Sequence, residues 1–269
     1  PSLIRDLKQY NYKTTFYYGG DINFANMKSY LLQSGMEKII DKRFFPSEEY
    51  NAKWGVHDHF VFEKLLADIK TADTPFFKIL LSLSSHPPFD TPIPTVISGN
   101  DDNSLFANAA NYSDKALGDF IKKLKKTKQW NHTIILFVAD HGIPYLDNCS
   151  VSAPVKYHIP MLWLGGTLKD IPQNVTKISS QTDIANTLLS QLNQGVEAYK
   201  YSKNIFSPTS KSFCFYTFNH GFGFLGDSTT HIYNYSGNRF LKKEGRTYPD
   251  SIGHAYLQKV SEDFGTMDN

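Results

Sequence analysis

The hydrophobic positions of this chain alternate between the spacing of buried strands and the spacing of amphipathic helices. Runs rich in apolar, aromatic and β-branched residues predict strands over residues 14–18, 76–83, 133–139 and 159–164. Apolar residues three or four positions apart predict helices over residues 2–10, 24–34, 58–72, 108–128 and 183–192. Because strands and helices alternate, we predict an α/β fold with a mostly parallel central sheet and helices on both faces.

Several predicted helices begin at residues that are good caps. Asn23 and Asp58 are predicted N-caps, and Ser180 or Thr182 is predicted to cap the helix over 183–192. The helix that starts at Asp58 is expected to bury an inner face made of Phe62, Leu65, Leu66 and Ile69.

After about residue 211 the pattern changes to short strands separated by turns that contain glycine. Residues 212–218, 229–235 and 239–243 predict antiparallel strands, and residues 252–264 predict a last helix. We therefore expect a main α/β domain over residues 1–210 and a β-rich appendage of the same domain over residues 211–269.

Composition narrows the function classes only slightly. The 269 residues are 41% hydrophobic and 20% charged, as in ordinary globular proteins, and the net charge of +2 gives no reason to expect nucleic acid as a partner. Two cysteines cannot form a disulfide framework, and no apolar run has the length of a membrane span. The chain begins at Pro1 without an initiator methionine or a signal-peptide pattern, so we expect it to be a piece of a longer protein.

The most informative chemistry lies at Asp140-His141-Gly142, directly after the predicted strand over 133–139. The carboxyl ends of strands are where open α/β sheets bind ligands. A carboxylate beside a neutral imidazole can hold a divalent cation, and the glycine allows a close approach of the backbone. The alternative is a turn in which the aspartate caps and the histidine is merely exposed.

Other histidines and acids follow or precede predicted strands. His86 and Asp21 come after strands, so they could share one pocket with Asp140 and His141. A histidine placed like His86 can donate a hydrogen bond to a phosphoryl or sulfuryl oxygen; the alternative is a loop histidine beside prolines. His158 precedes a strand, so we expect it at the opposite edge, as a loop histidine, unless its loop folds back.

The segment Trp54-Gly55-Val56-His57-Asp58-His59 leads into the predicted helix that Asp58 caps. We expect His57 and His59 to be exposed on the first turn of that helix and not to bind a metal.

Short motifs at these positions occur in a fixed order through most of the chain. They are residues 16–21 (FYYGGD), 54–58 (WGVHD), 85–89 (SHPPF), 111–117 (NYSDKAL), 139–142 (ADHG), 158–160 (HIP) and 180–184 (SQTDI). A sequence with these motifs in this order resembles the sulfatase and phosphoglycerol-transferase branch of the alkaline phosphatase superfamily, and is similar to the lipoteichoic acid synthases within it.

The resemblance implies a divalent metal, manganese, magnesium or zinc, in a sulfatase-like catalytic domain. By position in the motifs, Asp140 and His141 match half of the metal site, and His86 matches the histidine that contacts the transferred phosphate group. Tyr18 and Asp21 match the segment that lines the polar head-group pocket. We add Trp54 and His158, which lie in matching motifs, as candidates for binding substrate.

The chain also departs from the family pattern. Gly20 stands where lipoteichoic acid synthases carry an arginine, so a guanidinium that would bind phosphate is missing. The nucleophilic threonine and a further acidic metal ligand of the family precede the region that matches Pro1, so we expect no nucleophile in this chain. The sulfatase nucleophile pattern is absent as well, because Cys149 is followed by Ser-Val-Ser-Ala.

We interpret the chain as part of the catalytic domain of an extracytoplasmic, membrane-anchored enzyme that acts on phosphoric esters of the phosphoglycerol type through a covalent enzyme intermediate. Its expected partner is an ester linked to a phospholipid or glycan, with membrane contact only through a segment outside this chain. A sulfatase is the alternative within the enzyme class. A domain that only binds a glycan or a protein is the alternative from another class, and a purely structural module would not explain the histidines and acids at strand ends.

We expect this chain alone to have little or no activity, because two ligands bind a cation weakly and efficient catalysis also needs the nucleophile that the cation activates. The measurement is turnover of p-nitrophenyl phosphate and p-nitrophenyl sulfate by the purified chain with added Mn²⁺, Mg²⁺ or Zn²⁺. Clear metal-dependent turnover of either compound would contradict this expectation.

Overall fold

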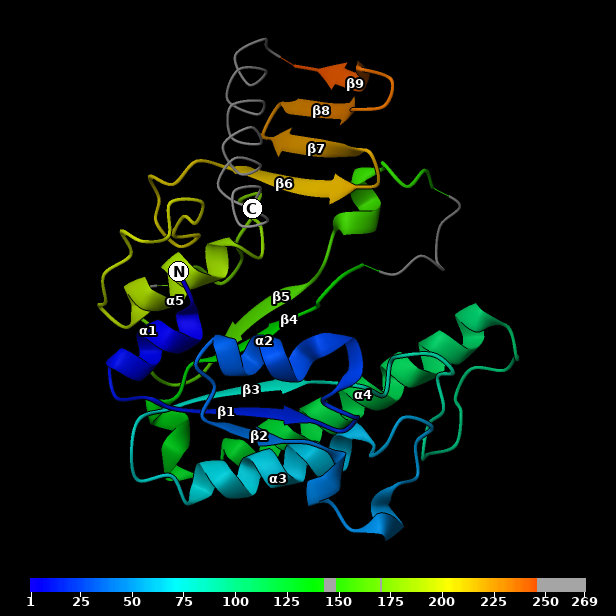
Figure 1. Cartoon of the computed structure of the whole chain (residues 1–269), viewed down its shortest axis with the longest axis vertical. Helices are drawn as coiled ribbons and strands as arrows, with labels where there is room; N and C mark the ends of the chain where they lie inside the picture. The colour runs from blue at the N-terminus through cyan, green and yellow to red at the C-terminus, as the bar shows by residue number, and fades with distance from the viewer. Residues whose placement is uncertain (143–148, 170, 246–269) are drawn as a thin grey trace. The chain divides into compact units, whose positions relative to one another are not determined.

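A three-stranded parallel sheet in the order β2-β1-β3 forms the centre of the N-terminal part of the chain (Figure 1). Its strands are β1 (Lys13–Tyr18), β2 (Lys38–Ile40) and β3 (Phe76–Leu81). The computed structural model describes residues 1–142, 149–169 and 171–245. The predicted helix over 252–264 lies outside the described residues.

Two compact units divide the chain, and each is described by itself. The first unit comprises Pro1–Ile135 with Leu164–Thr167, and the second comprises Leu136–Trp163 with the described residues from Leu168 onward. The predicted boundary at residue 210 stays a prediction.

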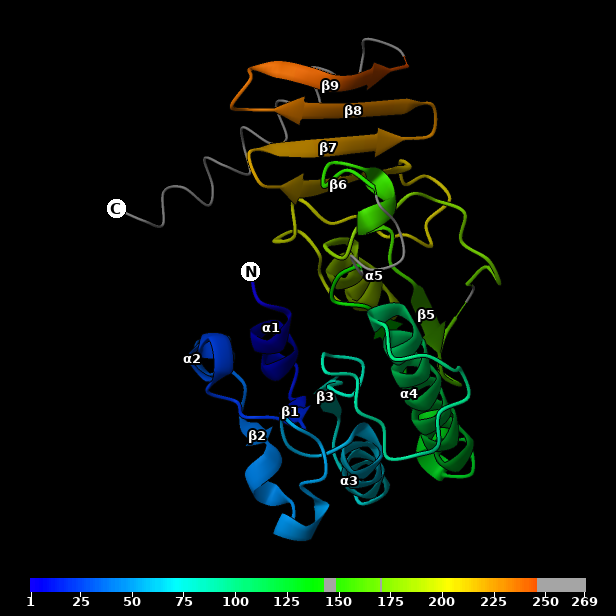
Figure 2. The ribbon, with the colours of Figure 1, turned by 90° about the vertical axis from the view of Figure 1, so that its right-hand side faces the viewer.

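Helices cover both faces of the parallel sheet (Figure 2). Helices α1 (Leu3–Gln9) and α2 (Met27–Gln33) lie on one face, and α3 (Asp58–Lys70) and α4 (Asp102–Leu124) lie on the other. Short 3₁₀ helices occur at Phe24–Asn26, Lys42–Phe44, Ser47–Glu49, Lys128–His132 and Pro154–Tyr157.

The alternation of side chains along β1 produces these two layers. Tyr17 is fully buried and packs with α3 and α4, whereas Phe16 and Tyr18 point to the opposite face and pack with α1 and α2. Both faces of a parallel strand must be covered in this way, which explains why β1 is apolar or aromatic at consecutive positions. The predicted inner face of α3 is confirmed, since Phe62, Leu65, Leu66 and Ile69 are all buried.

The described residues of the second unit hold most of a two-stranded sheet, one α-helix and a four-stranded antiparallel sheet. Strands β4 (Ile135–Val138) and β5 (Met161–Leu164) pair with each other, and α5 (Asp183–Gln191) follows. An antiparallel sheet in the order β6-β7-β8-β9 comes last, with strands Phe213–Phe218, Gly221–Gly226, Thr229–Asn234 and Arg239–Glu244. The predicted α/β fold, with a parallel sheet and an antiparallel C-terminal sheet, is therefore confirmed.

Strands β4 and β5 run in opposite directions. The backbone N–H of Ala139, just after β4, donates to the carbonyl oxygen of Pro160, just before β5 (3.4 Å). At the other end, the backbone of Gly165 approaches the carbonyl oxygen of Thr133 so closely that a Cβ on the glycine would lie 2.0 Å from it. The end of β4 therefore lies beside the beginning of β5.

Several predicted boundaries were wrong for identifiable reasons. The helix predicted over 24–34 is interrupted, because Ala25 and Asn26 adopt left-handed φ angles of 50° and 59°, and Asn23 makes no capping hydrogen bond. Helix α4 begins at Asp102, six residues before the predicted start at 108, because the side chain of Asp101 accepts hydrogen bonds from the N–H groups of residues 103 and 104.

Two glycines allow the loop after β1 to contact the loop before α3. The N–H of Val56 donates to the carbonyl oxygen of Gly19 (2.9 Å). A Cβ on Gly19 would lie 2.3 Å from the carbonyl oxygen of Val56, and a Cβ on Gly55 would lie 2.2 Å from that of Gly19. Since real Cβ atoms do not approach oxygen this closely, both positions require glycine.

We predict that Gly19→Ala destabilises the protein by about 1–3 kcal/mol, because the new methyl group must push the two loops apart. Gly118→Ala is the matched control. Gly118 lies inside α4, and a methyl group added there would have nothing within 4 Å, so this change should stabilise the protein by roughly 0.5–1 kcal/mol. Urea unfolding of both variants measures the difference, and equal stabilities would contradict it.

Candidate functional site

Three loops meet at the carboxyl edge of the parallel sheet in the first unit. They follow β1, precede α3 and follow β3. The Val56–Gly19 hydrogen bond joins the first two, and the indole Nε1–H of Trp54 donates to the carbonyl oxygen of Pro87 (2.7 Å), which joins the last two. The structure therefore brings the motifs of Tyr18, Trp54 and His86 together at one edge.

A buried carboxylate holds the loop that carries His86. Asp58 is 1% exposed, and its two oxygens accept hydrogen bonds from the backbone N–H groups of Leu83 (2.8 Å) and Ser84 (3.1 Å). Burial raises the pKa of Asp58, and these hydrogen bonds oppose that rise. Asp58 is the first residue of α3, after the N-cap residue His57, so the prediction that Asp58 is the N-cap was wrong.

His86 itself is exposed to solvent. Its ring nitrogen Nδ1 lies 2.9 Å from the carbonyl oxygen of Pro87. Because a carbonyl oxygen can only accept, Nδ1 carries the hydrogen, and Nε2 of a neutral ring presents a lone pair. The ring of Trp54 stands perpendicular to the His86 ring, with the two centroids 6.2 Å apart.

Tyr18 and Asp21 lie beside this edge in different environments. Tyr18 is buried, and burial, followed by the charges of Asp21 and Asp58, raises its pKa. Asp21 is exposed; the backbone N–H of Asn23 (3.0 Å) and the ammonium of Lys42 (3.5 Å) lower its pKa. Packing therefore holds Tyr18 in place, and Asn23 and Lys42 hold Asp21.

Gly20 lies directly against the ring of Tyr18. A Cβ at Gly20 would lie 2.6 Å from two ring carbons of Tyr18 and 2.8 Å from its hydroxyl oxygen. A larger residue at this position, such as an arginine, would therefore require the tyrosine ring to move.

The prediction that His57 and His59 are exposed on the first turn of α3 was wrong for His57 and incomplete for His59. His57 is 1% exposed and lies 3.4 Å from the hydroxyl of Ser84, and His59 is half-buried with Nδ1 2.6 Å from the hydroxyl of Tyr112. Helix α3 begins beside the carboxyl edge of the sheet, so the loop after β3 covers His57 at the start of the helix. A single sequence gives no sign of this covering loop.

Asp140 and His141 lie at the end of β4 in the second unit, and both side chains are exposed. Nδ1 of His141 is 2.8 Å from the carbonyl oxygen of Gly142, so it carries the ring hydrogen. Nε2 then has a lone pair, and it lies 3.5 Å from a carboxylate oxygen of Asp140. A ring nitrogen with a lone pair and a carboxylate oxygen therefore lie side by side, and both are atom types that can bind a cation.

The backbone around this pair is fixed by two other residues. The side-chain amide of Gln181 donates to the carbonyl oxygens of Ala139 (2.7 Å) and Asp140 (2.8 Å). Gly142 allows the chain to pass close to Lys156, since a Cβ on the glycine would lie 2.0 Å from the carbonyl oxygen of Lys156. Gln181 was missed as a contributor to the site, although it lies in the matched motif over 180–184.

Asp183 in turn fixes Gln181. This carboxylate is buried, accepts a hydrogen bond from the N–H of Ser180 (2.8 Å) and forms an ion pair with Lys203. Thr182, one of the two predicted caps, occupies the N-cap position of α5, but its side chain makes no capping hydrogen bond.

Asp140 and His141 line a cavity of about 1290 Å³ in the second unit. His158 lines the same cavity, so the prediction that it lies at the opposite edge was wrong. The cause is the antiparallel direction of β5, which brings the residues before β5 to the end of β4. Residues of β6, including Phe215 and Tyr216, form another part of the cavity wall.

The predicted site residues fall into both units. Tyr18, Asp21, Trp54 and His86 belong to the first unit, and Asp140, His141 and His158 belong to the second. That His86 and Asp21 share a pocket with Asp140 and His141 therefore stays a prediction. Within the described ranges, no three residues of the histidine, cysteine, aspartate and glutamate types are grouped as a metal site, and Asp140 and His141 form a pair only.

The parallel sheet covered on both faces and the polar groups at strand ends define an α/β protein with candidate site residues at the ends of its strands. The family model described as Sulfatase matches residues 1–196. The chain belongs to the sulfatase family.

Two curated relatives have more specific names. Phosphoglycerol transferase I of Xanthomonas campestris pv. campestris is 26% identical over 213 residues, which cover 74% of this chain and 30% of the transferase. Lipoteichoic acid synthase-like YvgJ of Bacillus subtilis is 24% identical, over 99% of this chain and 46% of that protein. The chain therefore spans less than half the length of these relatives.

Solved structures contain the same fold. A protein of the alkaline phosphatase superfamily from Vibrio parahaemolyticus has a TM-score of 0.78 and 25% sequence identity, over 91% of this chain and 63% of that chain. Among the helices that the structure describes, none is both long enough and apolar enough to cross a bilayer.

The buried position of His57 generates a prediction about pH. Burial lowers the pKa of His57, the charge of His59 adds to this, and Asp90 opposes it. Since the unfolded chain has the ordinary value of about 6.5, it binds more protons than the folded chain below about pH 6.5. The free energy of unfolding should therefore fall as the pH decreases from about 7.5 to about 5.5, and His57→Gln should reduce this fall.

Urea unfolding at both pH values measures the effect. His132→Gln, which removes an exposed histidine, is the matched control and should leave the wild-type fall in place. The same pH dependence in His57→Gln and in the control would show that His57 does not contribute.

Proposed function

We propose that this chain is the catalytic portion of an extracytoplasmic, membrane-anchored enzyme that transfers or hydrolyses phosphoric esters of the phosphoglycerol type through a covalent enzyme intermediate. The substrate would be an ester linked to a lipid or glycan. The name of one relative, phosphoglycerol transferase I, supports phosphoglycerol transfer as the class of reaction. A sulfate ester is the alternative substrate, which the name of the family model favours.

The pairing of Asp140 with His141 carries the proposal. Their carboxylate oxygen and ring nitrogen lie 3.5 Å apart, both side chains are exposed on a cavity wall, and the Gly142 carbonyl fixes the histidine tautomer. A ring nitrogen with a lone pair beside a carboxylate is a donor set that suits manganese, magnesium or zinc. We therefore assign Asp140 and His141 as two ligands of a divalent cation.

Such a cation, when bound, would lower the pKa of a nucleophile and neutralise charge that develops on the transferred group. Gln181 and Gly142 act as positioning residues in this proposal, because they fix the backbone on which both ligands lie. The carbonyl oxygens that Gln181 binds cannot move without losing two hydrogen bonds.

His86 is proposed to contact the transferred group. Because Nδ1–H is already donated to Pro87, a neutral ring has no hydrogen left on Nε2. His86 would therefore stabilise a phosphoryl oxygen as the imidazolium, with Nε2–H as the donor. Tyr18, Asp21, Trp54 and His158 remain proposed substrate-binding residues.

The proposal is tested on the protein as it occurs in its natural gene product. Asp140→Asn and His141→Gln should each weaken Mn²⁺ binding by at least roughly ten-fold and abolish turnover of a phosphatidylglycerol donor. His86→Gln should leave Mn²⁺ binding unchanged and lower kcat by roughly 10²–10³-fold. Mn²⁺ binding is measured by electron paramagnetic resonance, and turnover by release of diacylglycerol.

Matched controls come from exposed residues of the same types. Asp73→Asn and His132→Gln should change neither readout. Wild-type Mn²⁺ affinity in both ligand variants would overturn the metal assignment. Turnover of aryl sulfates without turnover of the phospholipid would replace the substrate class, and metal binding without turnover of either would favour a domain that only binds.

A further inference from the structure

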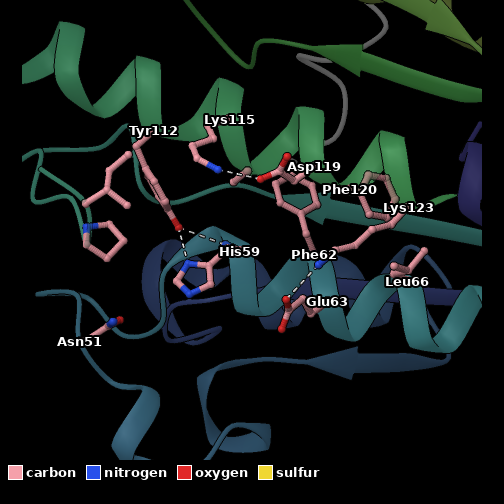
Figure 3. Close-up of a pocket in the computed structure, with 13 residues that line it drawn as sticks. Asn51, His59, Phe62, Glu63, Leu66, Tyr112, Lys115, Asp119, Phe120 and Lys123 are labelled. Carbon is pink, nitrogen blue, oxygen red and sulfur yellow. Dashed lines mark hydrogen bonds and ion pairs between the residues drawn. The ribbon is translucent and has the colours of Figure 1, made fainter. Parts of the chain in front are cut away.

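A second cavity, of about 440 Å³, lies between α3 and α4 in the first unit (Figure 3). Its volume falls within the usual range of small-molecule sites, about 300–1,000 Å³. None of the residues proposed above to bind metal or substrate lines it. The proposed function therefore leaves this cavity unexplained.

The floor of the cavity is apolar and is formed by buried side chains. Phe62 and Phe120 stack on one another with ring centroids 5.2 Å apart, and Leu66 and Ala116 extend the floor on either side. These side chains are buried members of the core that joins α3 and α4 to the sheet. An apolar body placed on this floor would lose its contact with water, and an aromatic ring could pack against the two phenylalanines.

Two hydrogen-bonded polar side chains, Tyr112 and His59, lie at one end of the cavity. The hydroxyl of Tyr112, which is 3% exposed, accepts a hydrogen bond from the backbone N–H of His59 (3.2 Å). Nδ1 of the His59 ring lies 2.6 Å from the same hydroxyl, and because a phenol O–H is a more acidic donor than an imidazole N–H, we assign the hydroxyl hydrogen to this bond. The ring of His59 then carries its hydrogen on Nε2, and within the described residues no acceptor pairs with that nitrogen.

The charges at the rim cancel. Lys115 pairs with Asp119 (2.9 Å), and Lys123 pairs with Glu63 (3.2 Å). Figure 3 shows both pairs beside the apolar floor, apart from the His59–Tyr112 hydrogen bond. A rim with no net charge provides no attraction for a strongly charged ligand.

We propose that this cavity binds a small uncharged molecule that has an aromatic or short aliphatic body and one oxygen acceptor. The body would lie on Phe62, Leu66, Ala116 and Phe120. The oxygen would accept the hydrogen bond from Nε2–H of His59. This proposal does not rest on the proposed function, since neither the ligand pair nor His86 takes part.

Acetophenone is the probe, because it is uncharged and has an aromatic ring and a single carbonyl acceptor. Ethylbenzene, which has a similar body without the acceptor, is the matched ligand. In titrations of the full chain followed by nuclear magnetic resonance, acetophenone should bind in the millimolar range or tighter and roughly five-fold more tightly than ethylbenzene. His59→Ala should remove this difference by weakening acetophenone binding only.

Ala116→Leu tests the location, because the longer side chain fills the floor of the cavity. It should abolish binding of both ligands, whereas Ala67→Leu, on the exposed face of α3, should not change binding. If Ala116→Leu does not fold, the His59→Ala titrations decide. Failure of acetophenone to saturate the chain up to its solubility limit, or unchanged affinity in His59→Ala, would overturn the proposal.

Discussion

The buried carboxylate of Asp58 is the interaction on which the sheet edge of the first unit depends. It lies at the start of α3 and binds the backbone of the loop after β3, so one side chain connects a helix, a strand end and the loop of His86. Removing a carboxylate from water is costly, and two backbone N–H groups offset that cost only in this geometry. The loop is therefore held in one conformation, and His86 is exposed at a fixed position.

The second unit uses the same arrangement at α5. Asp183 is also the first residue of its helix and is also buried, and it binds the backbone of Ser180 and the ammonium of Lys203. Gln181, between Ser180 and the helix, then holds the carbonyl oxygens beside Asp140 and His141. In both units, a buried aspartate at the first residue of a helix fixes the backbone near exposed polar side chains. These are His86 in the first unit, and Asp140 and His141 in the second.

The fold class could be predicted from the sequence because most of the longer strands and helices of the first unit carry their own hydrophobic pattern. Strand β7 was missed because its sequence, Gly221-Phe-Gly-Phe-Leu-Gly226, is rich in glycine, a residue that is unfavourable in strands. Three-residue β2 is too short to show a period. In both cases pairing with neighbouring strands, which a local pattern does not encode, decides the structure.

Site residues next to strand ends could also be predicted from the sequence. Residues whose position depends on the direction of a strand could not. Asp140, His141 and His86 lie at strand ends as the pattern predicts. His158 joins the first two because β5 is antiparallel to β4, and the apolar run over 159–164 has the same composition in either direction. The burial of His57 likewise depends on a loop that is distant in sequence.

The two histidines at strand ends share one local geometry with different chemical consequences. In His86 and in His141, Nδ1–H is donated to the carbonyl oxygen of the following residue, Pro87 or Gly142. Each neutral ring therefore presents the lone pair of Nε2 to solvent. Beside the carboxylate of Asp140, the proposed function uses this lone pair directly as a cation ligand, since no proton has to leave. At His86 the proposed contact with an anionic oxygen needs a hydrogen on Nε2 instead, so the proposal gives the same backbone geometry two different roles in the two units.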